Sequence, residues 1–105
     1  MSEQPPRSGA MTDEERARAL REQLKGLHGA DLAYGMMVEL VTYGYQKMGL
    51  TDETRDLREL GDARLAIELL RAALAVLERE VGEAPLRDLR GTLAQMQLGY
   101  ASAVA

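Results

Sequence analysis

Few residues in this chain of 105 could carry chemistry on their own. His28 is the only histidine, there is no cysteine, and Ser2, Ser8 and Ser102 lie near the two ends. A metal site needs three or four donor groups, and no carboxylate stands four residues from His28 to share a helical face with it. We therefore expect a structural loop histidine, no catalytic residue, no metal and no cofactor, and we expect that the protein is not an enzyme.

The remaining polar motifs also have structural explanations. The acids at Asp13 to Glu15 and at Asp52 and Glu53 stand where helices are expected to begin, and carboxylates favour the positive end of the helix dipole. Neither GxGxxG nor GxxxxGK[ST] occurs, so no phosphate loop is predicted. The net charge is -4 and no basic cluster appears, which argues against direct binding of nucleic acid.

One carboxylate stands out, Glu39 in the apolar segment AYGMMVELVTYGYQKMG. Helical steps of four and three place it in a narrow polar stripe with Gly35, Thr42 and Gln46, and the rest of the circumference is apolar or small. Three interpretations follow: a solvated carboxylate at a rim, an acid paired across an oligomer interface, or a ligand-binding or catalytic group. The first is the expectation, and it predicts that Glu39→Gln leaves the melting temperature and the mass unchanged.

The elements that must position these residues are all helices. We expect a disordered N-terminal tail over residues 1–11 and a single helical domain over 12–105. Thr12 and Glu15 have the spacing of a capping box, and the first helix then carries the stripe Ala17, Leu20, Leu24 and Leu27, ending near Gly26 and Gly29. Because this helix is short and strongly charged, we expect it to lean on some other surface.

Three further helices are predicted after it. The second runs from about Leu32, capped by Asp31, to Met48 before Gly49. The connection that follows is polar, with Leu57 and Leu60 as expected anchors. The third, capped by Asp62, has apolar residues in heptad steps, and Gly82 and Pro85 separate it from the fourth. The heptad positions are Ala63, Ile67, Leu70, Leu74, Leu77 and Val81, then Leu86, Leu89, Leu93, Met96, Tyr100 and Ala103. The short connection predicts an all-α, four-helix arrangement with a C-terminal antiparallel hairpin.

The second and third helices are apolar around about twice the arc that an outer helix of a monomeric bundle needs. Surplus apolar surface of this kind marks a partner site, so we expect oligomerisation, a homodimer first, to complete the fold. The predicted interface residues are Tyr34, Met37, Val38, Val41, Tyr45, Leu65, Leu69 and Val76. The alternative for the tyrosines is that they fill a core that lacks Phe and Trp.

Segments for export or membrane insertion are not apparent. Residues 1–11 contain no apolar region typical of a signal peptide, and the longest apolar run is interrupted at Glu39, Gln46 and Lys47. We expect a cytoplasmic protein that does not contact a membrane.

Three segments resemble the DUF1844 family of small bacterial proteins of unknown function: VELVTYGYQKMG, DARLAIELLRAALAVLEREVG and LRDLRGTLAQMQLGY. The similarity covers roughly Val38 to Tyr100. The chain departs from the family's usual Asn-Leu-Thr-like turn after Gly82, with Glu83, Ala84 and Pro85 in its place. The resemblance implies a compact helical protein without known catalytic residues.

Two functions follow as hypotheses. The first is a helical interaction or scaffold protein that acts as a homo-oligomer, with a possible further protein partner. The alternative is an accessory factor that associates with the translation machinery through protein contacts. A ligand site in the bundle core is a third and weaker option.

Overall fold

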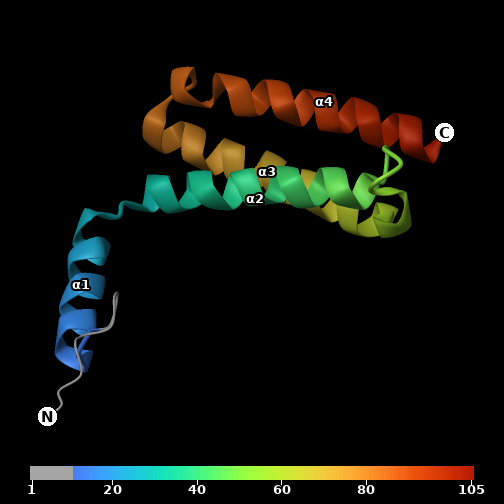
Figure 1. The fold of residues 1–105 in the computed structure, drawn as a ribbon. Coiled ribbons are helices and arrows are strands. Elements are labelled where there is room, and N and C mark those ends of the chain that lie inside the picture. Colours follow the sequence, from blue (N-terminus) through green and yellow to red (C-terminus); the bar gives the residue numbers. More distant parts are fainter. Residues whose placement is uncertain (1–10) are drawn as a thin grey trace, which may run out of the picture.

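The computed structural model describes residues 11–105 and is built from helices alone over that range (Figure 1). The α-helices are α1 (Asp13–Gly26), α2 (Gly29–Met48), α3 (Leu60–Val81) and α4 (Arg87–Val104), and two 3₁₀ turns, η1 (Arg55–Leu57) and η2 (Ala84–Leu86), lie in the connections. The predicted all-α class with four helices is confirmed. The expected disordered tail falls, apart from Met11, outside the described residues.

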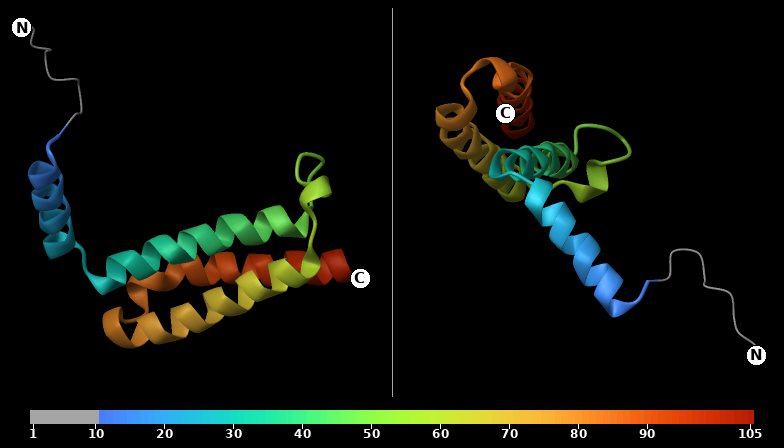
Figure 2. Two further views of the ribbon diagram at one scale, coloured as in Figure 1. Left: turned by 90° about the horizontal axis from the view of Figure 1, so that it is seen from below. Right: turned by 90° about the vertical axis from the view of Figure 1, so that its left-hand side faces the viewer.

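Helices α2, α3 and α4 run alternately up and down and pack into one three-helix body (Figures 1 and 2). A turn of η2 that contains Pro85 joins α3 to α4, so these two helices form the predicted antiparallel hairpin. Proline is tolerated there because the first positions of a helix leave their N–H groups unpaired in any case.

The core lies where the three helices face one another. Its buried apolar side chains are Met37 and Met48 from α2, Ala63, Ala66, Ile67, Leu70, Leu74 and Leu77 from α3, Leu86 from η2, and Leu89, Leu93 and Met96 from α4. The predicted heptads are therefore confirmed over most of their length. Val81, the last residue of α3, is exposed. Each fully buried Leu or Met contributes about 1.5–3 kcal/mol, so this row carries most of the stability.

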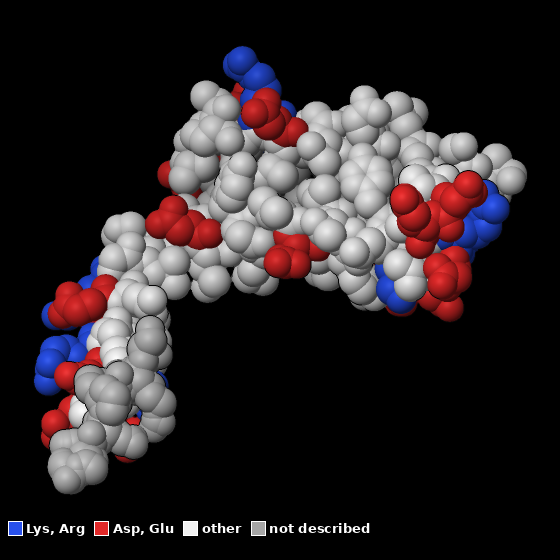
Figure 3. Space-filling view, in the orientation of Figure 1, with Lys and Arg blue, Asp and Glu red and all other residues white. Residues whose placement is uncertain are grey.

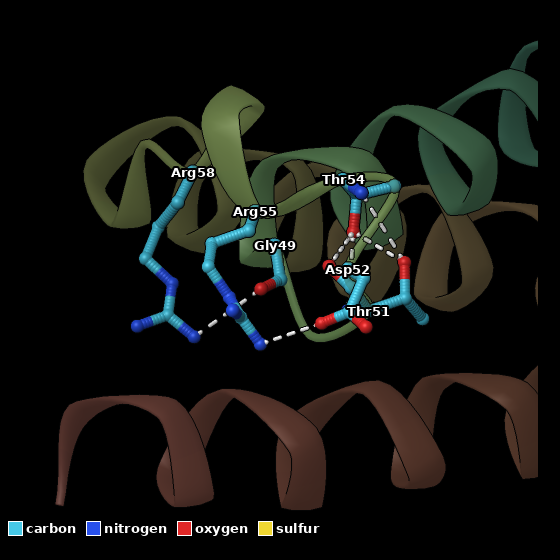
Figure 4. Close-up of polar contacts among 6 residues, drawn as sticks. All are labelled: Gly49, Thr51, Asp52, Thr54, Arg55 and Arg58. Atoms are coloured by element: carbon cyan, nitrogen blue, oxygen red, sulfur yellow. Dashed lines mark hydrogen bonds and ion pairs between the residues drawn. The ribbon is translucent and has the colours of Figure 1, made fainter.

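The connection from α2 to α3 is organised around Gly49 and Arg58 (Figure 4). Gly49 ends α2 in the left-handed conformation, with φ of 62°. The Nε of Arg58 donates to the carbonyl oxygen of Met48 at 2.9 Å, and the backbone N–H of Glu59 donates to the carbonyl of Lys47 at 2.8 Å. A cation and an N–H thus satisfy the free carbonyls at the negative end of α2.

Several predicted helix limits and anchors differ from those observed. Asp31 was expected to cap α2, but the backbone N–H groups of Asp31 and Leu32 both donate to the carbonyl of His28, so the helix begins earlier, at Gly29. The predicted cap Asp62 lies inside α3, which begins after Glu59. Leu57 is exposed and does not anchor the connection.

Helix α1 stands away from the other three (Figure 2). Its capping box is present as predicted, with Thr12 and Glu15 exchanging two hydrogen bonds of 3.0 Å. Leu20 and Leu24 are 55% and 59% exposed, and α1 packs against none of the other described helices. Within residues 11–105 nothing supports α1, so the expectation that it leans on some other surface stays a prediction.

Candidate functional site

The main surface feature is an open apolar groove between α2 and α3, with a volume of about 670 Å³. Its lining residues recur at helical spacing on both sides: Ala33, Met36, Glu39, Leu40 and Tyr43 from α2, and Leu69, Ala72, Ala73 and Val76 from α3. Steps of three and four keep such residues on one face of a helix. The α2–α3 groove, as we call it, is therefore formed by two regular faces and not by an irregular loop.

The chemistry of the α2–α3 groove suits burial of aliphatic and aromatic side chains. Met36 and Val76 are 58% and 53% exposed, and Leu69 is nearly half exposed. The only polar side chains in the lining are Glu39 and Tyr43. The ammonium group of Lys47 lies 5.6 Å from the centre of the Tyr43 ring, a distance at which a cation is attracted to the ring face.

Glu39 lines the groove on an exposed part of α2. Within residues 11–105 its carboxylate forms no ion pair. In its predicted stripe, Thr42 is turned back onto its own helix and donates to the carbonyl of Val38 at 3.3 Å. The solvated carboxylate expected from the sequence is compatible with this position, and pairing across an interface stays a prediction.

The structure divides the predicted interface residues among three places. Leu69 and Val76 line the α2–α3 groove, and Leu65 is an exposed neighbour one turn before Leu69. Met37 is completely buried among the core residues of its own chain, and its assignment to an interface is wrong. Val41 is half-buried against the same core.

The other three predicted residues lie on the opposite side of α2. Successive residues of a helix are rotated by about 100°, so Val38 and the groove residue Met36 point to opposite sides of buried Met37. Tyr34 and Tyr45 share the side of Val38, and all three are exposed. Tyr45 borders a second hollow, of about 440 Å³, formed with Thr42, Gln46, Leu50, Thr51 and Thr54.

The sequence reasoning missed Met36, Leu40, Tyr43 and the alanines of α3. A signal for them was present, because Ala33, Met36, Leu40 and Tyr43 step by three, four and three along one face. On α3, the sequence had already indicated Leu65, Leu69 and Val76. The rows on α2 and α3 form one groove only when the two helices lie side by side.

Charged residues gather elsewhere on the molecule (Figure 3). In the orientation of Figure 1, they concentrate on α1 and at the connection between α2 and α3, whereas the middle of the three-helix body is mostly uncharged. Arg90 and Glu78 form an ion pair that joins α4 to α3. Arg71 donates a hydrogen bond of 2.5 Å to the carboxylate of Glu68, which raises the pKa of the Arg71 guanidinium. None of these four residues lines the groove.

No cluster suited to catalysis is found in the described part of the chain. His28 precedes α2 without a side-chain capping bond. Among residues 11–105, no three acidic or histidine side chains gather as metal ligands do, and no side-chain polar atom is buried without a partner. None of the described helices combines the length and the apolar character that crossing a bilayer requires.

Comparisons with known proteins add no relative to this picture. A scan against protein-family models, a search of curated proteins and a search of solved structures each found no match to this chain. The resemblance to the DUF1844 family therefore stays a prediction. The α2–α3 groove is the feature of the described chain that bears on its function.

Proposed function

We propose that this protein is a non-enzymatic helical interaction or scaffold module that acts as a homo-oligomer, with the dimer as its basic unit. The observation that carries the proposal is the α2–α3 groove, which no element of the described chain covers. A contiguous apolar surface on a small protein marks a site of association. The contributing side chains are large, regularly spaced and carried on two packed helices, so little ordering is needed before a partner binds.

Burial of the surplus apolar side chains of the groove would favour association. Met36, Tyr43, Leu69 and Val76 are each about half exposed in one chain. Full burial of such side chains is favourable by roughly 1.5–3 kcal/mol each, so covering their exposed halves contributes several kcal/mol when added over two copies. That contribution is large enough to offset much of the entropy lost when two copies associate.

The test is the solution mass of the full chain. Sedimentation equilibrium is expected to give twice the 11.5 kDa of one chain. The variant Leu69→Asp places a charge in the α2–α3 groove and is expected to give the mass of one chain. Leu98→Asp is the matched control, because Leu98 is 67% exposed and does not line the groove.

Circular dichroism of the three proteins separates association from folding. The helical signal of Leu69→Asp should resemble that of Leu98→Asp, since both side chains are exposed in the single chain. A wild-type protein that sediments as one chain at every concentration tested would contradict the proposal.

A further inference from the structure

Within residues 11–105, the α2–α3 groove has no partner, and neither has the apolar stripe of Ala17, Leu20 and Leu24 along α1. We propose that the groove of one copy receives the α1 helix of a second copy. The proposal rests on the self-association proposed above, and it assigns the occupant of the groove.

The dimensions of the two surfaces match. Helix α1 has 14 residues, and at 1.5 Å per residue it is about 21 Å long. The groove lining on α2 extends from Ala33 to Tyr43, a distance of about 15 Å on the same basis. From Ala17 to Leu24 the helix rises by about 10 Å, so the whole stripe fits within the groove. Side chains that step by three and four pack well between the side-chain ridges of two neighbouring helices.

The charges of the two surfaces are complementary. Glu39 is the one charged residue in the groove lining. On α1, Arg21 stands one residue after Leu20 and three before Leu24, which places it along the border of the stripe. Neither side chain forms an ion pair in residues 11–105. We call α1 the arm. An ion pair between Glu39 and Arg21 at the rim of the groove would set the orientation of the arm more than its affinity for the groove.

The connection between α1 and α2 favours another copy over the same chain. Only Leu27 and His28 separate the two helices, and both have extended backbone conformations. They direct α1 away from the three-helix body (Figure 1). The groove begins at Ala33, close to this hinge, so an arm returning to its own groove would have to reverse direction within two residues. Short hinges are a known cause of exchange of an element between copies.

Disulfide trapping in the full chain tests the occupant directly, because the natural sequence has no cysteine. We would make two single-cysteine proteins, Leu24→Cys on the arm and Ala72→Cys in the groove, with a tag on one of them. After mixing and mild oxidation, the expected product is a disulfide between Cys at 24 of one chain and Cys at 72 of the other. Leu98→Cys, mixed with Leu24→Cys, is the control for random collision.

The outcomes separate this inference from the proposal beneath it. A dimeric mass with disulfides only between two copies of the Ala72→Cys chain would show groove-to-groove association, which overturns the arm assignment and leaves self-association standing. An intramolecular disulfide in a chain carrying both substitutions would also overturn it, because the arm then covers its own groove. A monomeric mass without cross-linking would contradict both the arm assignment and the self-association.

A second experiment introduces charged side chains on α1 and measures the strength of the dimer. Leu20→Asp with Leu24→Asp alters only side chains that contact no other helix in the single chain. The expected result is at least a tenfold weaker dimer, with unchanged melting of the three-helix body at concentrations where both proteins are single chains. Retention of the wild-type dissociation constant would contradict the proposal.

Discussion

Helix α3 has two apolar faces built from the same residue types at the same spacing, yet only one is covered. Leu70 and Leu74 are fully buried against α2 and α4, whereas Leu65, Leu69 and Val76 are about half exposed on the other face. The difference is not in the amino acids but in what lies opposite them. One face therefore holds the chain together, and the other is available to bind a partner.

The largest effect expected from this comparison is on the buried face. Leu74→Ala should lower the free energy of unfolding by about 2–5 kcal/mol, because it removes buried methyl groups and leaves a cavity. Leu65→Ala, on the open face and 55% exposed, should lower it by less than about 1 kcal/mol. Urea denaturation of both variants at a concentration where the protein is a single chain measures the contrast, and equal losses would show that Leu65 is buried within that single chain.

A comparable contrast exists between Gly49, which caps α2, and Gly35, which lies inside it. Gly49→Ala should destabilise the protein by about 1–3 kcal/mol, since its φ is 62° and an added Cβ would lie 2.7 Å from the Cβ of Arg58. Gly35→Ala, in the helix interior with open space around it, should stabilise by about 0.5–1 kcal/mol. Thermal melting should move in opposite directions, and a stabilising Gly49→Ala would contradict the described turn.

A smaller effect is expected where Arg58 meets the end of α2. Arg58→Met should cost about 1–2 kcal/mol, because the carbonyls of Met48 and Gly49 lose a charged donor. Arg55→Met is the control, since its 2.9 Å ion pair with Asp52 is solvent-exposed and contributes at most about 1 kcal/mol. Denaturant titration checks the difference, and indistinguishable midpoints would argue against the cap.

The smallest effect concerns Glu39. If it pairs with Arg21 at the rim of the groove, Glu39→Gln should weaken the dimer by less than about 1 kcal/mol, and the effect should shrink at high salt. Sedimentation at two ionic strengths measures it. An unchanged dissociation constant at both ionic strengths would indicate the solvated carboxylate expected from the sequence. A change of oligomeric state would indicate a buried pair.

The core was predictable because heptad periodicity alone selects the residues that face a neighbour. Ile67, Leu70 and Leu74 stand out in this way from the sequence. The groove was harder to predict, because α2 is apolar on both sides of Met37. Only the packing of α3 and α4 decides which of these two sides stays open. Met37 itself was misplaced for this reason.

Short sequence patterns predicted some helix ends correctly and others incorrectly. The capping box of Thr12 and Glu15 and the left-handed Gly49 were recognisable because each depends on a few adjacent residues. Asp31 and Asp62 look like helix caps, but the backbone bonds to His28 and Glu59 start both helices earlier. The isolation of α1 within the described residues is a tertiary property, which the periodicity of its apolar stripe does not reveal.

The two-residue hinge at Leu27 and His28 has a consequence for how large an assembly can grow. If α1 of one copy fills the groove of another, as proposed, two chains satisfy each other only when the hinge angle lets both exchanges close around a twofold axis. At any other angle, each added chain leaves one arm and one groove free for the next, and growth continues into rings or filaments. Backbone torsions at two residues would thus decide between a finite particle and a fibre.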